Sequence, residues 1–316
     1  MRIIIGNFLV FVLSINFLLA GGGSKTSAFE FLRNESSSRA AGLAGSFVCF
    51  ANDPNIIFYN PAGLSTIEKT SASFGFLKHL MDVNGGFASY TQNVDFLDGW
   101  VGFGLQYINY GSFDETNETG DVLGTFGAGD LAFSVGYSRK NENNLSYGAN
   151  IKVIYSSIAS NSSLGIAGDI GLFYSLPEQM VNIGFSVLNI GAQIKSYNGY
   201  NENLPLDVKI GISKKLEHLP LNINFNFHHL NFNYDDFIER FKAFSIGGEF
   251  TLSQYIQLRI GYNNERRQDL ELGTSKGLSG FSVGLGVLIN KYHFDYALSS
   301  YGNIGSLHRI NITTSF

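Results

Sequence analysis

Apolar and polar residues alternate one by one along most of this chain, and this period of two restricts its fold more than any other feature. Segments 145–156, 221–228 and 244–252 each place aliphatic and aromatic side chains at one parity, with glycine, serine, asparagine or a charge at the other. Successive side chains of a β-strand point to opposite faces, so each segment is predicted to be a strand with one apolar and one polar face. The same split recurs in 101–107, 131–137, 208–212, 256–262, 281–289 and 292–298.

Strands of this kind assemble in two ways. A soluble sandwich buries the apolar faces between two sheets, whereas a membrane barrel turns them to lipid and turns the polar faces to a lumen. The polar faces here are mostly uncharged, and only 15% of all residues are charged, against roughly 25% in ordinary soluble domains. We therefore predict an all-β fold, a transmembrane antiparallel β-barrel of about fourteen strands. The charged side chains expected to face its lumen are Asp130, Lys152, Asp169, Lys209, Glu249 and Arg259.

The spacing between the predicted strands supports the barrel. With a first strand near 70–77, the connections at one end are predicted near 78–84, 110–128, 157–164, 191–204, 231–242, 263–278 and 299–305. The shorter connections at the other end are predicted near 94–98, 140–144, 175–179, 214–219, 252–255 and 290–291. Short periplasmic turns and longer extracellular loops are typical of outer-membrane barrels. The barrel is predicted to span 69–316, and its last strand, 308–316, ends on an aromatic residue, as many such barrels do.

The N-terminus reads as a targeting segment. Met1 and Arg2 precede an apolar run from Ile3 to Ala20, which is the pattern of a secretory signal peptide, and the alternative interpretation is a retained membrane anchor. Cleavage is expected after Ala20 or as late as about Ala28, with export through the Sec pathway to the bacterial outer membrane. No apolar run of 18 residues follows residue 20, so a helical membrane protein is not expected.

Residues 29–68 lack the alternation and are predicted to form a plug with short helices inside the barrel. Two turns are marked by proline, at Asp53-Pro54 and at Asn60-Pro61-Ala62-Gly63. The alternative interpretation of this segment is a simple periplasmic arm.

The same segment carries a family resemblance. Ser38-Arg39-Ala40-Ala41-Gly42, Asn52-Asp53 and Tyr59-Asn60-Pro61-Ala62-Gly63-Leu64 resemble the N-terminal hatch of the PorV/PorQ family, which is related to FadL-type barrels. Residues 107–116, 204–230 and 261–282 look like segments of PorQ-type proteins. The resemblance implies a fourteen-stranded outer-membrane barrel of the type IX secretion system, without catalytic activity. Its implied partners are a PorZ-like surface protein, a PorU-like sortase and a PorV-like barrel, in contact with outer-membrane lipid and lipopolysaccharide.

Catalytic and metal-binding motifs are weak in this sequence. Gly280-Phe281-Ser282-Val283-Gly284 matches a nucleophile-elbow pattern, but it lies inside an alternating strand rather than at a strand-to-helix turn. His228 and His229 are adjacent, and on a strand they would point to opposite faces, so no metal site is expected. The single cysteine, Cys49, excludes an internal disulfide, and a net charge of −5 gives no nucleic-acid footprint. We expect no cofactor and no catalytic residue.

Three functions stay open at this stage. The first is a non-enzymatic scaffold that anchors the surface attachment complex for secreted cargo. The alternative is a FadL-like outer-membrane transporter of hydrophobic small molecules, which needs an apolar pocket beside the plug. The third is a barrel enzyme, for which only His293 and Asp295 share a lumenal face and no serine partner can be assigned.

Overall fold

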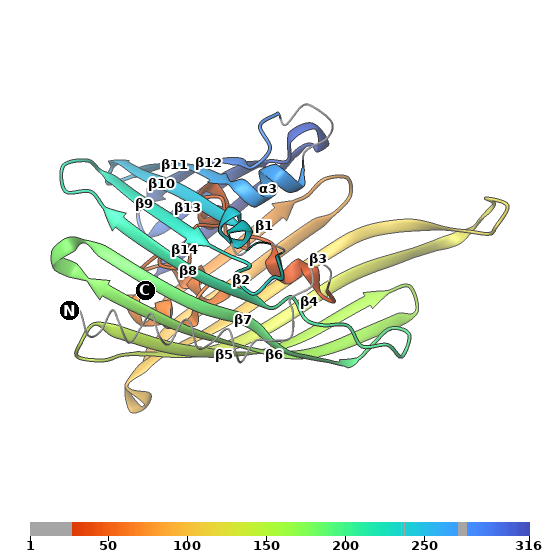
Figure 1. The fold of residues 1–316 in the computed structure, drawn as a ribbon, viewed down its shortest axis with the longest axis horizontal. Coiled ribbons are helices and arrows are strands. Elements are labelled where there is room, and N and C mark those ends of the chain that lie inside the picture. Colours follow the sequence, from red (N-terminus) through yellow and green to blue (C-terminus); the bar gives the residue numbers. More distant parts are fainter. Residues whose placement is uncertain (1–26, 235, 237, 271–276) are drawn as a thin grey trace.

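The computed structural model describes residues 27–234, 236, 238–270 and 277–316, and the predicted signal peptide lies outside them. Fourteen antiparallel strands each pair with their neighbours in the chain, and β1 pairs with β14 to close the barrel (Figure 1). The predicted fold class is confirmed. The strands are β1 Ser71–Lys78, β2 Asn84–Val94, β3 Gly99–Thr116, β4 Val122–Lys140, β5 Leu145–Ile158, β6 Asn161–Leu176, β7 Val181–Lys195, β8 Asp207–Lys215, β9 Leu221–Phe227, β10 Phe244–Ser253, β11 Ile256–Asn263, β12 Phe281–Ile289, β13 Tyr292–Ser300 and β14 Ser306–Ser315.

The apolar face of the strands is the outer face of the barrel. In β5, Ile151 and Val153 are 68% and 47% exposed, whereas Asn150 and Lys152, which alternate with them, are each 3% exposed. This is the reverse of a soluble sandwich, in which the apolar parity would be buried. Among the described residues, none of the helices combines the length and the hydropathy required to cross a bilayer.

The two ends of the barrel differ in their connections. At the end that we call the turn end, the connections are 95–98, 141–144, 177–180, 216–220, 254–255 and 290–291. At the loop end they are 79–83, 117–121, 159–160, 196–206, 228–243, 264–280 and 301–305, and the last long one contains α3 (Asn264–Asp269).

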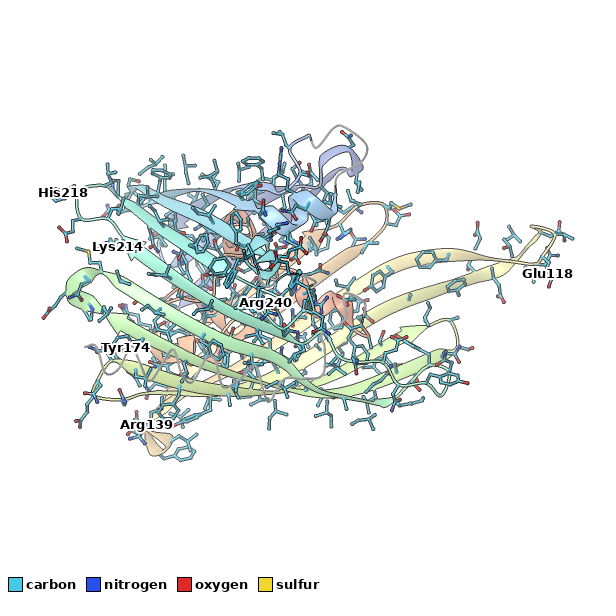
Figure 2. The ribbon with its side chains drawn as sticks, in the orientation of Figure 1. Glu118, Arg139, Tyr174, Lys214, His218 and Arg240 are labelled. Carbon is cyan, nitrogen blue, oxygen red and sulfur yellow. The ribbon has the colours of Figure 1, made fainter. Side chains whose placement is uncertain are left out.

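The predicted loops at 110–128 and 157–164 are wrong. β3 and β4 continue through most of 110–128 as a hairpin that projects from the loop end, with Glu118 at its tip, while Arg139, Lys214 and His218 lie at the opposite end (Figure 2). The pairing of β3 with β4 resumes after a bulge between Asn109 and Ser112, where Gly111 has φ 86°. Beyond the bulge, the rings of Phe113 and Phe126 stack across the two strands, with centroids 5.5 Å apart. The strand pairing therefore continues through most of the segment that was predicted to be a loop.

Residues 27–68, which we call the lumenal segment, lie inside the barrel. They form η1 (Glu30–Arg33), α2 (Ser38–Gly42), η2 (Pro54–Phe58) and η3 (Pro61–Thr66). The polar residues before three of these turns act as N-caps: Ser37 accepts from the Ala40 amide, Asp53 from that of Asn55, and Asn60 from that of Ala62. α2 packs against β11–β14, and η2 and η3 pack against strands from β1 to β6. The segment enters at the loop end, where the Ala28 amide bonds to Asn203 O (3.0 Å), and leaves at the turn end beside Phe316.

Glycines on the inner face of the wall let the backbone of the lumenal segment approach it closely. A Cβ atom at Gly148 would lie 2.6 Å from the Ala62 nitrogen, and one at Gly261 would lie 2.4 Å from the Leu43 carbonyl carbon. Such contacts are too short for any side chain, so these two positions require glycine. The glycine-rich inner parity thus reflects a filled lumen.

Candidate functional site

The first candidate site is a cavity of about 260 Å³ at the loop end, between the lumenal segment, β8–β11 and α3. We call it the charged cavity, because carboxylates, guanidinium groups and imidazoles dominate its wall. Its charged and titratable side chains include Glu35, Asp207, His228, His229, Glu265 and Arg266.

Glu35 ties the lumenal segment to the wall and to α3. Its carboxylate accepts from Arg309 of β14 (Nη2, 3.1 Å) and from Arg266 of α3, while its carbonyl accepts from Arg309 Nε (3.0 Å). Burial by itself would raise the pKa of this carboxyl, but the two guanidinium groups more than offset burial and lower the pKa to about 2. Glu35 is therefore charged at neutral pH.

Replacing Glu35 with glutamine is expected to make the barrel less stable at neutral pH, because buried Arg309 would lose its counter-charge. The depressed pKa means that the wild-type contribution is present above pH 4.5 and fades as the pH falls toward about 2. The thermal unfolding midpoints of the two proteins in detergent should differ most at pH 7 and converge below pH 3. A midpoint difference that stays constant from pH 7 to pH 3 would contradict this role.

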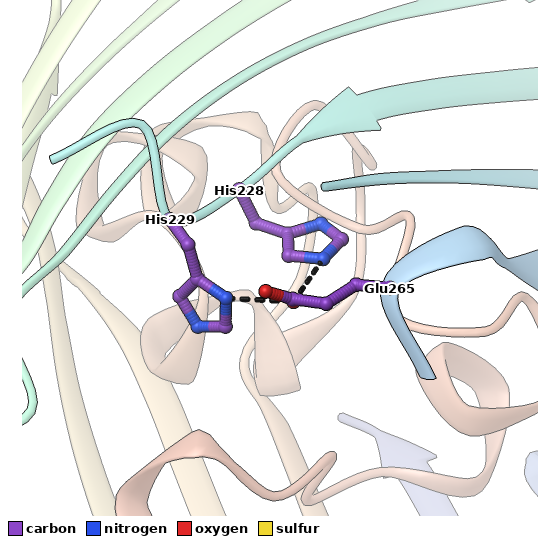
Figure 3. Close-up of side chains that lie close together, drawn as sticks. All are labelled: His228, His229 and Glu265. Carbon is purple, nitrogen blue, oxygen red and sulfur yellow. Dashed lines mark hydrogen bonds and ion pairs between the residues drawn. The ribbon is translucent and has the colours of Figure 1, made fainter. Parts of the chain in front are cut away.

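His228, His229 and Glu265 form a compact group of titratable side chains beside the charged cavity (Figure 3). Glu265 Oε2 lies 2.9 Å from His228 Nε2 and 2.7 Å from His229 Nδ1. The expectation that the two rings point to opposite faces is wrong, because β9 ends at Phe227 and His229 has φ 52°, which turns its ring to the same side. Burial lowers the pKa of His228, and the two imidazoles outweigh burial to lower the pKa of Glu265.

Asp207 contacts both the backbone and the ring of His229, on the side away from Glu265. Its Oδ1 accepts from the His229 backbone amide (2.7 Å), and its Oδ2 lies 3.5 Å from His229 Nε2. Lys209 pairs with the same carboxylate (3.1 Å). The predicted lumenal residue Lys209 therefore belongs to this site, whereas sequence reasoning missed the acidic partner two positions earlier on the same face.

Glu249 and Arg259, both predicted lumenal residues, belong to a second group that we call the inner network. Arg39 of α2 donates Nε and Nη2 to the two oxygens of Glu249 (2.8 and 2.7 Å) and Nη1 to Asp53 (3.2 Å). Arg259 joins Glu249 (2.7 Å) to Asp295 (2.5 Å). This network fastens the lumenal segment to β10, β11 and β13. Arg39 had been noted only as part of the family motif.

The three remaining predicted residues lie further round the wall. Lys152 and Asp169 form a buried ion pair (2.9 Å), and Lys152 also bonds to Asn189 of the β7 bulge (2.7 Å). Asp130 accepts from Tyr110 (2.6 Å) and from Ser156. The six residues all lie on the inner face, but the structure divides them among separate groups.

The plug-turn residues Asn60, Pro61, Ala62 and Gly63 hold the lumenal segment rather than open a cavity. Asn60 Nδ2 donates to Val48 O (2.9 Å) and to Leu172 O of β6 (3.0 Å). The asparagine thus caps η3 and links it to the barrel wall with one side chain.

The second candidate site is a cavity of about 360 Å³ at the base of the projecting hairpin. Rings and aliphatic groups form most of its wall, so we call it the aromatic groove; they belong to Phe29, Tyr110, Phe113, Ile158 and Tyr197. Phe29 comes from the lumenal segment and packs over Gly165, where a Cβ would lie 2.7 Å from its ring. The start of the lumenal segment therefore borders the aromatic groove with Phe29 and the charged cavity with Arg33 and Glu35.

The positions considered for catalysis are occupied by structural contacts. Ser282 lies within β12, as the alternation predicts, and not at a turn. Both ring nitrogens of His293 are engaged, Nδ1 by Asp295 (2.8 Å) and Nε2 by Gln257 (2.6 Å), so neither faces a serine hydroxyl.

A closed barrel of fourteen antiparallel strands with its N-terminal segment inside the lumen defines the class: this is the fold of FadL-type barrels. Solved structures agree. TodX, the toluene transporter of Pseudomonas putida, aligns with a TM-score of 0.60 and 14% identity over 89% of this chain and 98% of that one. The Ralstonia pickettii toluene transporter TbuX aligns with a TM-score of 0.59 and 12% identity, over 89% of this chain and 98% of that one. A Pseudomonas aeruginosa FadL homologue aligns with a TM-score of 0.55 and 11% identity, over 94% of this chain and 100% of that one.

Sequence comparison gives a narrower result. No protein-family model matches the chain. A UPF0164 protein of Treponema pallidum (strain Nichols) is 27% identical over 201 residues, which cover 56% of this chain and 58% of that protein. The match thus spans less than two thirds of the relative. The comparisons establish the FadL-type fold, and the finer PorV/PorQ assignment stays a prediction.

Proposed function

We propose that the protein is a FadL-like outer-membrane channel that takes up small molecules with a hydrophobic portion, and that its loop end is extracellular. The observation that carries the proposal is the aromatic groove, an apolar cavity of about 360 Å³ beside the start of the lumenal segment. The structural neighbours named as toluene transporters share the fold. The type IX secretion role draws no comparable support from these neighbours.

The groove suits an apolar ligand because its wall offers rings and aliphatic groups at the membrane-distal end of the lumen. Most of the free energy of binding would come from removing apolar surface from water, at roughly 25 cal/mol per Å². The polar atoms of Asp130 and Ser156 are bonded to each other and to Tyr110 or Tyr197, so they offer little to a polar ligand. Selectivity at this site would depend on size and shape.

For a molecule bound in the aromatic groove to pass through the barrel, the lumenal segment has to move. Below the groove, the packed core of this segment fills the lumen: Leu43, Phe47, Ile56, Ile57 and Leu64 are all fully buried. The charged cavity also borders this segment, and charged side chains such as Glu35, Asp207 and Arg266 line it. A hydrophobic molecule is therefore expected to stop at the groove until the segment shifts.

Replacing Phe29 with alanine is expected to weaken binding of toluene to the purified barrel about tenfold, because the ring that closes one side of the groove is removed. Isothermal titration of the detergent-solubilised protein measures this. Leu123→Ala, near the hairpin tip and 66% exposed in the wild type, is the matched control and should bind like the wild type. The proposal fails if the wild-type protein shows no saturable binding of toluene or of a medium-chain fatty acid.

The projecting hairpin supports a second candidate, the anchoring of a surface partner. Val122 and Leu123 near its tip are 62% and 66% exposed, beyond the rim of the barrel. A PorZ-like protein of a surface attachment complex would be the partner under the family resemblance. Purification from the native outer membrane in mild detergent tests this, because the partner should be recovered with the intact chain and lost when residues 113–125 are replaced by a short turn. Retention of the partner by the trimmed barrel would exclude the hairpin as its docking site.

A further inference from the structure

We propose that His228, His229 and Glu265 bind a divalent first-row transition metal, with Zn²⁺ as the reference ion, and that the charged cavity supplies the open coordination position. The nearest ligand atoms of the three side chains all lie within 4.8 Å of one another. Two imidazoles and one carboxylate form a donor set that zinc uses where a fourth position is left for water or a ligand.

The backbone brings the two imidazoles together for a specific reason. On a regular strand adjacent side chains diverge, but His229 lies just past the end of β9 with φ 52°. This left-handed conformation is uncommon outside glycine, although asparagine, aspartate and histidine adopt it more often than other residues, and it is held here by the bond from the His229 amide to Asp207 Oδ1 (2.7 Å). Glu265 arrives from the first turn of α3, which Asn263 caps by accepting from the Arg266 amide (2.9 Å). Figure 3 shows both rings directed at Glu265.

A second observation points to a missing ligand. The His228 side chain is buried, and its Nε2 lies 2.9 Å from Glu265 Oε2 without forming a hydrogen bond of acceptable geometry. A buried ring nitrogen without a satisfactory partner destabilises the folded state. A metal ion between the imidazoles and the carboxylate would use the lone pair of this nitrogen.

The surroundings have the features of an outer coordination shell. His229 faces the cluster with Nδ1, while its Nε2 lies 3.5 Å from Asp207 Oδ2, so a carboxylate is placed behind a ligating imidazole. The nearby cations are already paired, Lys209 with Asp207 and Arg266 with Glu35. Arg266 still acts on Glu265 through charge, but the ion-pair partners of the Glu265 carboxylate are the two imidazoles.

The donor chemistry also selects the metal. Mg²⁺ and Ca²⁺ prefer shells made of oxygen, whereas imidazole favours zinc, copper, nickel and cobalt. Zinc bonds of about 2.0–2.2 Å hold tetrahedral ligand atoms roughly 3.3–3.5 Å apart. The present separations of 2.7 and 2.9 Å from Glu265 must then widen by about half an ångström. The longest separation between ligand atoms, up to 4.8 Å, must shorten.

The test uses the untagged, EDTA-treated barrel in detergent, titrated with ZnCl₂ and, in parallel, with MgCl₂. We expect one equivalent of Zn²⁺ per chain, no comparable binding of Mg²⁺, and d–d absorption of a low-symmetry site with Co²⁺. His228→Ala, His229→Ala and Glu265→Gln should each weaken binding of Zn²⁺ by more than a hundredfold. Asp207→Asn should weaken it about 10- to 100-fold, because only the outer shell is changed.

His218→Ala is the matched control, since this histidine lies at the turn end (Figure 2) and should leave Zn²⁺ affinity unchanged. Heat-modifiability on a gel shows that each variant is a folded barrel, and Glu265→Gln keeps the size of the side chain. The proposal is overturned if wild type and His228→Ala/His229→Ala bind Zn²⁺ equally, or if His218→Ala lowers the affinity as much as the cluster variants. Binding of toluene by the wild type does not enter this test, so failure here leaves the channel proposal standing.

Discussion

Replacing Arg39 with alanine is expected to unseat the lumenal segment from the barrel wall. The change removes the paired contacts to Glu249, the contact to Asp53 and the stacking of the guanidinium over Phe50 (4.3 Å to the ring centroid). Breaking one side of a largely buried ion pair costs about 3–5 kcal/mol, because the other charge stays buried. The Arg39 side chain is 21% exposed, so the lower end of this range is expected.

Two measurements check this effect. The thermal midpoint should fall, and the conductance of single barrels in a planar bilayer should rise as the segment leaves the lumen. Arg139→Ala is the control: this arginine pairs with Asp98 at the turn end, and both side chains are well exposed, so at most about 1 kcal/mol is expected. Removing Glu249 together with Arg39 should cost less than the sum of the single changes, since the two residues share one interaction. Equal conductance and midpoint for the two single arginine variants would show that the inner network does not hold the segment.

Replacing Gly148 with valine is expected to displace the Asn60–Leu64 turn while leaving the barrel closed. A Cβ at this position would already lie 2.6 Å from the Ala62 nitrogen and from the Pro61 carbonyl carbon, and backbone atoms cannot yield as a flexible side chain can. Overpacking of a buried site costs typically about 1–3 kcal/mol, and a branched side chain against backbone is expected to exceed this. Valine suits the strand itself, so the wall should still form.

Cys49 reports this displacement, because it is the chain's only cysteine and is fully buried in the lumenal segment. A maleimide reagent should leave the folded wild type unlabelled and should label Gly148→Val. Gly124→Val on the projecting hairpin is the control, since the nearest atom to a Cβ there is the Glu115 carboxylate at 3.8 Å. Continued protection of Cys49 in Gly148→Val would mean that the turn accommodates the side chain without moving.

Burial also raises the pKa of the Cys49 thiol to about 12, so the buried thiol reacts slowly even with a reagent small enough to reach it. Exposure of the segment would return the pKa of the thiol toward its ordinary value. Labelling would then increase both because the reagent can reach the thiol and because more of the thiol is in the reactive thiolate form. The same assay can therefore be applied to Arg39→Ala, and both variants should label if each displaces the segment.

Alternation carried the prediction of the strands, and the low content of charged residues and the spacing of the connections favoured a barrel over a sandwich. Alternation also placed Lys152, Glu249 and Arg259 on the inner face. Alternation could not predict which residues these side chains contact. Glu249 pairs with Arg39, which lies 210 positions away, and this contact depends on how far the lumenal segment runs inside the barrel. The predicted loop at 110–128 was wrong because sequence spacing gives no sign that a ladder will continue beyond the membrane.

The sequence by itself thus determined the strands, their two faces, the barrel and the two turns marked by proline in the lumenal segment, since all of these follow from local preferences and a fixed period. Only the tertiary structure decided the sites. His228 and His229 were expected to diverge, and they converge because the strand ends before them and Asp207, from a neighbouring strand, holds His229 in a left-handed conformation. Glu265 reaches them from a different loop. Sites of this kind depend on where elements end and meet, and those positions are set by packing across the whole barrel.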